Sequence, residues 1–521
     1  MQTLSVLERL ATRAGSGPDA PAITEANGNS LSRGSLIRRA SAVARGFTAA
    51  GLQPGDRVLY AVRPSTVSFL LMTGILEAGG VVVPMPSTMG SALFRSRLEL
   101  LSPKWVVAES VLYLASASRL IRRLLYRRGV TLPPISDIDV ANVVRVGRAW
   151  PGVPPGLSVA ALEELGELSD DSTPATLEGD AAAFIVFTSG TTGDPKAVLH
   201  SRRSMQGTLE LVGSLMDAGA GDVVYARDLH LIVPALLAEA AVVIPRISRF
   251  SAKRTVRDLE KFRVTHFFGV TAELQAMVDY LRTRNRKLPR TLREIWIGAA
   301  PVHAAFLQEF RSIVAADTQV WCVYGMTEIL PVARVSLEDK LLYEGEGDLV
   351  GECVPGVSAR VSTNGELVVS GANLCPGYVG EPRRTEHATG DFARLDNGRI
   401  ALLGRRKDMI IRGRFNIYPE LYETTIDRID GVRRCAMVGF YDDAVADERV
   451  VLAVEQNAGV DASELEKRLW RELRDGPFSI DVAAMPDAIL VMELPVDGRS
   501  SKVDKASLRE YARQKTSCAS R

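Results

Sequence analysis

The stretch that most constrains this chain is an apolar run that ends abruptly in small and hydroxylated residues. Residues 182–187 have the length and composition of a buried strand, and the loop Thr188-Ser-Gly-Thr-Thr-Gly-Asp-Pro195 follows directly. Glycines let backbone N–H groups approach an anion, hydroxyls add donors, and Lys196 adds a mobile cation. The distance along the chain from Gly190 to Lys196 differs from the glycine-to-lysine spacing of the G-x-x-x-x-G-K-[ST] loop. The pattern predicts either a different phosphate-binding loop or an ordinary polar surface loop.

Length and charge limit the class of protein. With 521 residues and 46% hydrophobic content, the chain exceeds the usual size of one domain and can form several cores. A net charge of +1 provides no overall field that would attract nucleic acid. The five cysteines are scattered without a C-x-x-C pair, which argues against a disulfide framework or a zinc site and fits a reducing cytoplasm. Neither a signal peptide nor a transmembrane span is predicted.

Helix and strand patterns alternate over most of the chain. A helical pattern at 35–50, a strand-like run at 57–62, a helix at 65–77 and an apolar run at 81–84 follow in order. This alternation of strands and helices is typical of βαβ units, in which parallel strands are covered by helices. Further strands are predicted at 105–108, 265–270, 294–297 and 319–323. We expect an α/β fold whose large N-terminal domain holds several subdomains with βαβ-type sheets.

The pattern changes after about residue 404, where Gly404 and the charged residues 405–408 suit a linker. Beyond it, strand-like runs at 435–440, 450–454 and 488–492 alternate with a helix at 462–474. That helix places Leu465, Leu469 and Leu473 on one face, with Asp461 and Glu464 positioned to cap its start. A small α+β domain is therefore expected at the C-terminal end.

Residues 111–128 have the pattern of one basic amphipathic helix. Such a helix can pack on the core with its basic side in solvent. It can also lie peripherally on an anionic membrane or meet an acidic carrier protein. The pattern alone does not choose between these interpretations.

Five short motifs follow one another in an order and spacing that resembles the adenylate-forming superfamily. This superfamily includes acyl-CoA and aryl-CoA synthetases, nonribosomal peptide adenylation domains and firefly luciferase. The motifs are Thr188 to Lys196, Gly298-Ala-Ala-Pro301, Tyr324-Gly-Met-Thr-Glu328, Thr389-Gly-Asp391 with Gly404-Arg405, and Ser501-Lys502-Val-Asp-Lys505. The resemblance spans nearly the whole chain. It implies an ATP- and acyl-binding domain at 1–404, a hinge at 405–408 and a small mobile domain at 409–521.

The resemblance also assigns roles within an ATP-dependent activation of a carboxylate through an acyl-adenylate. The loop would hold the β- and γ-phosphates, Glu328 would help to hold Mg²⁺, and Asp391 would accept the ribose hydroxyls beside Arg405. Tyr324 would stack on adenine or simply pack in the core. The residues expected to contact ATP are Thr188, Ser189, Gly190, Thr191, Thr192, Gly193, Lys196, Gly298, Ala299, Ala300, Pro301, Tyr324, Gly325, Met326, Thr327, Asp391 and Arg405.

The C-terminal domain is expected to supply the remaining parts. Lys502 resembles the family's lysine that reaches the carboxylate and the nucleotide in the adenylation transition state, with Lys505 as a nearby competitor. The small domain would then rotate about Lys407, so that Gly413 forms part of the surface where a thiol approaches. The sequence departs from the family's usual small residues at Ala197, Ala299 and Ser501.

The apolar residues in 229–240 and 329–332 favour a fatty or otherwise hydrophobic acid. His230 would gate the acyl site or pack beside it, and Ile329 would line it. The segment 404–419 follows the acyl-CoA ligase pattern, which favours CoA as the acceptor. However, the shortened segment that starts at Leu229, with 86–90 and 325–332, is similar to bacterial β-lactone synthetases, which act on 3-hydroxy acids without CoA. Loading of an acyl carrier protein and an inactive nucleotide-binding scaffold are further alternatives.

Overall fold

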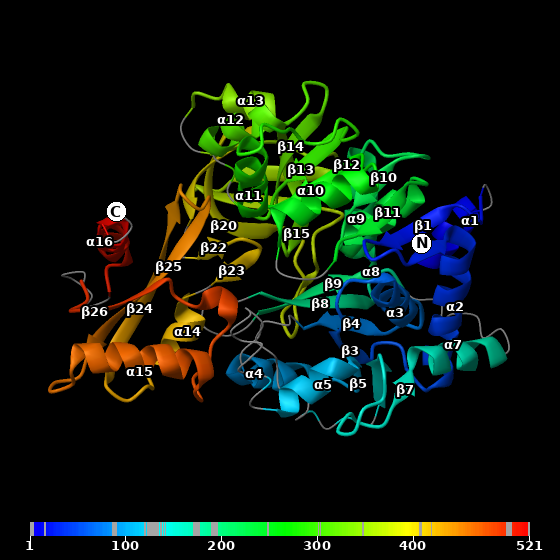
Figure 1. Cartoon of the computed structure of the whole chain (residues 1–521), viewed down its shortest axis with the longest axis horizontal. Helices are drawn as coiled ribbons and strands as arrows, with labels where there is room; N and C mark the ends of the chain where they lie inside the picture. The colour runs from blue at the N-terminus through cyan, green and yellow to red at the C-terminus, as the bar shows by residue number, and fades with distance from the viewer. Residues whose placement is uncertain are drawn as a thin grey trace.

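The computed structural model describes residues 5–14, 17–85, 91–118, 121, 135, 138, 140, 142–169, 178–188, 196–246, 250–300, 302, 304–345, 348–405, 409–417, 419–495 and 503–518. Two large sheets with their helices form one body, and a smaller group of orange and red elements lies beside it (Figure 1). The expected α/β architecture with a large N-terminal and a small C-terminal part is confirmed. None of the described helices is long and apolar enough to cross a bilayer.

The first sheet has eight strands and holds the predicted phosphate loop. Its order is β19 (Gly377–Tyr378), β9 (Lys196–Ser201), β8 (Ala182–Thr188), β4 (Val81–Pro84), β3 (Arg57–Ala61), β5 (Trp105–Glu109), β6 (Asn142–Val146) and β7 (Leu157–Ser158). The strands from β8 to β7 run parallel, as the βαβ pattern predicts, whereas β9 and β19 join antiparallel at one edge.

The second sheet has thirteen strands. Its order is β17 (Val357–Val361), β18 (Glu366–Gly371), β20 (His387–Asp396), β21 (Arg399–Arg405), β16 (Asp348–Cys353), β15 (Ile329–Ser336), β14 (Gln319–Met326), β13 (Glu294–Ile297), β12 (His266–Gly269), β10 (Val223–Tyr225), β11 (Ala241–Ile244), β1 (Pro21–Glu25) and β2 (Ser30–Ser32). The half from β14 to β1 is parallel, and the half from β17 to β15 is antiparallel.

Helices cover both sheets, and several begin at serine caps. The Ser65 side chain accepts a hydrogen bond from the Ser68 backbone N–H, which fixes the start of the helix predicted at 65–77. The helices of the large body are α1 (Val6–Ala14), α2 (Arg33–Ala49), α3 (Thr66–Glu77), α4 (Ser91–Leu101), α5 (Ser110–Ala117), α7 (Val159–Leu168), α8 (Arg202–Leu215), α9 (Leu229–Leu237), α10 (Ala252–Lys261), α11 (Thr271–Arg282), α12 (Ala304–Ile313) and α13 (Leu337–Leu341).

The prediction of one continuous helix at 111–128 is wrong at its centre. Helix α5 ends at Ala117 because Ser118 has an extended backbone, which cannot continue the helical hydrogen bonds. Most of the basic part of that segment lies outside the described residues. The idea of a membrane or carrier contact there therefore stays a prediction.

The C-terminal part has its own small sheets and core. A hairpin of β22 (Ile410–Arg412) and β23 (Phe415–Ile417) precedes the sheet of β24 (Val432–Asp442), β25 (Asp447–Gln456) and β26 (Ala488–Val491). The helices are α14 (Pro419–Ile426), α15 (Ala462–Asp475) and α16 (Lys505–Cys518), with the 3₁₀ turn η2 (Val482–Ala484). The predicted cap is present, since Asp461 accepts from the Glu464 N–H, and Leu465, Leu469 and Leu473 are fully buried.

One crossing of the chain joins the two large sheets. Between β18 and β20 of the thirteen-stranded sheet, the chain leaves to add β19 to the edge of the eight-stranded sheet, where Tyr378 pairs with Val198. Residues 327 and 328 form the turn between β14 and β15 of the thirteen-stranded sheet. The candidate site lies at this junction.

Candidate active site

The predicted phosphate loop connects two antiparallel strands. β8 ends at Thr188, β9 begins at Lys196, and the ladder pairs these two residues directly. The antiparallel return thus brings Lys196 back to the point where the loop begins. The loop residues predicted to hold phosphate, Ser189, Gly190, Thr191, Thr192 and Gly193, lie outside the described residues, as does the Thr188 side chain.

Tyr378 links the predicted phosphate lysine to the predicted metal carboxylate. Its hydroxyl donates to Glu328 Oε1 at 2.8 Å, and Lys196 Nζ lies 4.8 Å from the centre of its ring. The Arg384 guanidinium carbon lies 4.3 Å from the same ring. A ring face attracts cations by its quadrupole, so one side chain orients two cations and one carboxylate. We call these four residues, Lys196, Glu328, Tyr378 and Arg384, the Tyr378 corner.

The surroundings of the Tyr378 corner fix the protonation and the orientation of its side chains. Burial and the Glu328 carboxylate raise the pKa of Tyr378 far above neutrality, so the phenol keeps its proton and donates. Arg384 Nη1 lies 3.0 Å from His387 Nδ1, and burial lowers the pKa of this imidazole. The Glu328 backbone is also fixed, because its carbonyl accepts from the Cys375 N–H at 2.8 Å. No local motif marks Tyr378 as a site residue, although the Pro376-Gly377 pair before it indicates a turn.

His200 fixes the turn that carries Glu328. Its Nε2 lies 2.8 Å from the carbonyl oxygen of Thr327, and because a carbonyl only accepts, Nε2 must hold the proton. Burial lowers the pKa of His200, which keeps the imidazole neutral. His200 lies in β9, four positions after Lys196. The same strand therefore positions both the lysine and the Thr327–Glu328 turn.

The predicted ribose and adenine residues also meet. The Tyr324 hydroxyl donates to Asp391 Oδ2 at 2.7 Å, so a β14 side chain orients a buried β20 carboxylate. The β20–β21 ladder pairs Asp391 with Arg405, whose side chain lies outside the described part of the chain. Gly325 and Met326 end β14, and a Cβ atom at Gly325 would lie 2.6 Å from Leu330. A side chain at Gly325 would therefore require the terminal methyl group of Leu330 to move.

The segment that starts at Gly298 lies close to two neighbours. A Cβ atom there would lie 3.1 Å from the Val323 carbonyl oxygen and 3.4 Å from the Phe268 ring. Ala299 has a φ of 64°, in the left-handed region where a side chain costs about 1–2 kcal/mol. The departure at Ala299 thus carries backbone strain. Ala300 is half-buried, and Pro301 lies outside the described residues.

The two predicted gate residues have different surroundings. Ile329 is fully buried in the main core cluster at the start of β15. His230 lies in the first turn of α9, where burial lowers the pKa of its imidazole while the Asp228 carboxylate raises it. The apolar side chains of α9, such as Leu231, Ile232 and Val233, pack into the same core as Ile329. Helix α9 and β15 therefore contribute apolar side chains to the same large core.

Sequence comparison identifies this arrangement. The profile of the family described as "AMP-binding enzyme" matches residues 10–379, which include Lys196, Gly298, Glu328 and Tyr378. The chain belongs to the AMP-binding enzyme family. The resemblance inferred from the motifs is thereby confirmed.

Two relatives and one solved structure are similar to this chain. The chain is 28% identical to the olefin beta-lactone synthetase of Stenotrophomonas maltophilia over 78% of this chain and 77% of that protein. It is 29% identical to a feruloyl-CoA synthase of Amycolatopsis over 95% of this chain and 97% of the relative. The amide bond synthetase McbA of Marinactinospora thermotolerans superposes with a TM-score of 0.79 at 22% identity, covering 98% and 99% of the two chains. The last likeness concerns the fold.

In this AMP-binding enzyme, Glu328 has the chemistry of a ligand for a hard cation. It is a buried carboxylate with one oxygen bound to Tyr378, and Lys196, which is predicted to bind phosphate, lies against the ring of the same tyrosine. Within the described residues, no group of three His, Cys, Asp or Glu side chains forms a metal cage. A cation that shares its ligands between one carboxylate and ATP phosphates fits these residues.

The small domain of this AMP-binding enzyme turns its first hairpin toward the large domain. Arg414 Nη2 lies 2.8 Å from Glu273 Oε2 in α11, and Arg414 Nη1 lies 3.8 Å from Asp228 Oδ2, just before α9. Gly413, predicted at the thiol-facing surface, has a φ of 58° and donates its N–H to Asp447 Oδ1 at 2.8 Å. The hairpin residue next to Gly413 thus contacts the segment that holds His230.

Of the other predicted C-terminal residues, the structure describes only Lys505. Lys502 and Lys407 lie outside the described residues. The competitor Lys505 begins α16 and pairs with Glu423 of α14 at 2.8 Å, inside the small domain. In Figure 1, α16 lies at the far side of the small domain from β8 and β9. Lys505 is therefore used within the small domain, whereas the Gly413 hairpin faces the large one.

Proposed function

We propose that this protein is an acid–thiol ligase that converts a hydrophobic carboxylic acid, ATP and CoA to an acyl-CoA, AMP and pyrophosphate. The observation that carries the proposal is the Tyr378 corner, which brings a phosphate lysine and a metal-type carboxylate together at the end of the β8–β9 hairpin. The hydrogen bond from Tyr324 to Asp391 orients the two residues that we expect to contact the adenine and the ribose of ATP.

In the first step a carboxylate oxygen attacks the α-phosphorus of ATP, and the bond to the pyrophosphate oxygen breaks. Charge develops on phosphate oxygens and must be met by fixed donors. We assign this role to Lys196 and the loop 188–193, with Arg405 near the α-phosphate and Lys502 on the attacking carboxylate. Mg²⁺ would be held by Glu328 and would supply charge neutralisation on the phosphates.

In the second step the CoA thiol sulfur attacks the acyl carbonyl carbon, and AMP leaves with the electron pair of the broken C–O bond. The family's domain rotation would place Gly413 beside the reacting carbonyl. The contacts of Arg414 with Glu273 and Asp228 support an arrangement in which this hairpin faces the large domain. We propose residues 1–404 and 409–521 as the two bodies and 405–408 as their hinge.

A hydrophobic acid is supported by the apolar core to which both α9 and β15 contribute. Its side chains are apolar and fully or nearly buried, and they include Leu231, Ile232, Val233 and Ile329. A second charged group on the acid would lose its hydration against such side chains without a partner. His230, at the start of α9, is the polar residue best placed to border the acyl site.

The test is a product analysis. The protein is incubated with ATP, Mg²⁺ and a panel of plain and 3-hydroxy fatty and aryl acids, with and without CoA, and products are identified by mass spectrometry. We expect acyl-AMP without CoA and acyl-CoA with it. Absence of acyl-AMP across the panel would reject the proposal in favour of a nucleotide-binding scaffold. Transfer only to a phosphopantetheinyl carrier protein would replace CoA as the acceptor.

A second candidate is closure of a 3-hydroxy acid to a β-lactone. It is favoured by the shortened segment that starts at Leu229 and by the similarity to an olefin beta-lactone synthetase. The first step would be the same, but the substrate's own hydroxyl oxygen would attack the acyl carbonyl and release AMP. A product about 18 mass units lighter than the hydroxy acid, formed without CoA, would decide for this candidate, because closure of the lactone ring removes one water.

A further inference from the structure

The Thr389-Gly-Asp391 motif interrupts the regular pairing of two strands. The register of β18 against β20 shifts at this point, so that residues 389–391 lie opposite the single residue Leu367. Gly390 has a φ of 80°, in the left-handed region that glycine adopts without steric cost. Such a bulge bends its strand and changes the direction of a side chain. We call residues 389–391 the Asp391 bulge.

The Glu366 side chain holds the centre of the Asp391 bulge. Its Oε1 accepts from the Gly390 N–H at 2.9 Å, and Glu366 is buried. The backbone of Glu366 is fixed as well, because its N–H donates to the Ser362 hydroxyl at 3.0 Å and its carbonyl accepts from the Ser362 N–H at 2.9 Å. A hydrogen bond to a carboxylate is stronger than one between neutral groups. Glu366 therefore holds the bulge from a fixed position at the start of β18.

The Thr389 side chain holds the two ends of the same bulge. Its hydroxyl donates to the Leu367 carbonyl at 3.0 Å and accepts from the Asp391 N–H at 3.1 Å. Leu367 is the residue opposite the bulge and follows Glu366 directly. Side-chain oxygens thus accept from the N–H groups of both Gly390 and Asp391.

The direction of the Asp391 carboxylate depends on this bulge. Asp391 is buried, and its Oδ2 accepts from the Tyr324 hydroxyl at 2.7 Å. The phenol orients the carboxylate, whereas the bulge positions the backbone that carries it. A carboxylate accepts from two ribose hydroxyls only when its oxygens lie at hydrogen-bond distance from them. A displacement of about 1 Å is enough to weaken such a contact strongly.

We propose that Glu366 is a positioning residue for ribose recognition. Its hydrogen bond to Gly390, together with the Thr389 hydroxyl, directs the Asp391 carboxylate at the ribose hydroxyls of the nucleotide. This assignment rests on the proposed function, which gives Asp391 the ribose. Because Glu366 acts through the Asp391 bulge, its loss should weaken only the part of nucleotide binding that the hydroxyls contribute.

The experiment compares two nucleotides that differ only at the ribose. Binding of AMP and of 2′,3′-dideoxyadenosine 5′-monophosphate to the full chain is measured by calorimetry, and the ratio of the two Kd values gives the preference for the hydroxyls. We expect the wild type to prefer AMP at least about tenfold, because the dideoxy nucleotide lacks the hydrogen bonds to a charged group. Asp391→Ala gives the ratio without the carboxylate.

Four variants show whether Glu366 sets this ratio. Glu366→Ala and Thr389→Val should each lower it at least about threefold. Glu366→Gln should retain most of it, because an amide oxygen can still accept from the Gly390 N–H. Glu352→Ala is the matched control and should leave the ratio unchanged, since Glu352 is an exposed residue of β16 in the same sheet.

The ratio separates a positioning role from a general loss of structure. Equally weaker binding of both nucleotides in Glu366→Ala and Thr389→Val overturns the inference, and so does an unchanged ratio in both. If Glu366→Ala does not fold, Thr389→Val decides alone. A wild-type ratio equal to that of Asp391→Ala also overturns it. The measurement needs neither acid nor CoA, so a normal ratio without acyl-AMP in the product analysis rejects the ligase and leaves the positioning role intact.

Discussion

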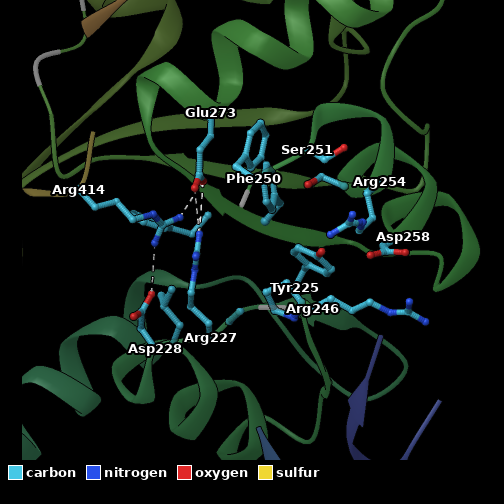
Figure 2. A pocket seen from close by; sticks show the side chains of 16 residues that line it. Tyr225, Arg227, Asp228, Arg246, Phe250, Ser251, Arg254, Asp258, Glu273 and Arg414 are labelled. Carbon is cyan, nitrogen blue, oxygen red and sulfur yellow. Dashed lines mark hydrogen bonds and ion pairs between the residues drawn. The ribbon is translucent and has the colours of Figure 1, made fainter. Parts of the chain in front are cut away.

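The Tyr378 corner and the contact of the Arg414 hairpin with the large domain are both charged, but they are built in different ways. In the corner, the strands β9 and β19 and the turn after β14 belong to sheets within the large body, and backbone ladders fix their positions. In the hairpin contact, the ion pair of Arg414 with Glu273 joins the small domain to α11 (Figure 2). A site held by the hydrogen bonds between strands is pre-organised. A site held by an ion pair between domains exists only while the two domains are docked. The first suits the proposed phosphate chemistry, and the second suits a domain that is proposed to move between the two half-reactions.

The strongest test of this division concerns Lys502, the one proposed catalytic group that the small domain contributes to adenylation. Lys502→Ala should lower acyl-adenylate formation by about 10²-fold or more, because a positioned transition-state donor is lost. Pyrophosphate release measures this step. Transfer of a chemically prepared acyl-AMP to CoA should be much less affected. Unchanged pyrophosphate release would contradict the assignment.

Tyr378→Phe tests the corner itself. The variant removes the hydrogen bond to Glu328, and such bonds to charged groups contribute about 1.5–3 kcal/mol, so we expect at least about tenfold slower pyrophosphate release. The Mg²⁺ concentration at half-saturation should rise, which a purely structural loss would not cause. Tyr511→Phe on α16 is the matched control. Equal Mg²⁺ dependence in wild type and Tyr378→Phe would show that the phenol does not orient the carboxylate.

Gly413→Leu tests the docked hairpin. A side chain at this left-handed φ costs about 1–2 kcal/mol. If Gly413 lies on the thiol-facing surface as proposed, the added side chain should slow transfer to CoA by about tenfold while sparing acyl-AMP formation. Gly459→Leu is the control, since Gly459 also has a positive φ, with open space around it in the small domain. If both half-reactions fall equally in Gly413→Leu, misfolding is the explanation and the assignment fails.

Ala299→Gly should produce the smallest effect. Relief of the left-handed strain at Ala299 should raise the free energy of unfolding by about 0.5–1 kcal/mol. Ala446→Gly, at a residue with a φ of 51° in the small domain, gives the matching comparison outside the site. Chemical denaturation measures both. A loss of stability in Ala299→Gly would show that the methyl group contributes packing that outweighs the strain.

The sequence predicted the elements of the corner better than their contacts. The strand at 182–187, Lys196, Glu328 and Asp391 were visible because each is marked by a local pattern or motif. Tyr378, His200 and the Arg414–Glu273 pair were missed, and their partners lie 50, 127 and 141 residues away along the chain. Such contacts depend on sheet order and register. No local pattern encodes the addition of β19 to a distant strand.

The antiparallel half of the second sheet was missed for a similar reason. The βαβ rhythm predicts parallel strands, and it holds from β14 to β1, but β15 to β21 are joined without intervening long helices. The break at Ser118 was also not visible, because the apolar spacing continues through it. Periodicity reports which face is buried, whereas the end of a helix depends on backbone conformation.

The short edge strand β19 also determines how order can be lost near the ATP site. It spans only Gly377 and Tyr378 and is held by pairing with one strand, assisted by the Val379 N–H, which donates to the Ala197 carbonyl. Local opening at a sheet edge requires much less free energy than global unfolding. Detachment of these residues would release Glu328 from its phenol while both large cores stay folded. Amide hydrogen exchange at Val379 is therefore a direct measure of how often the phosphate site disassembles in the native protein.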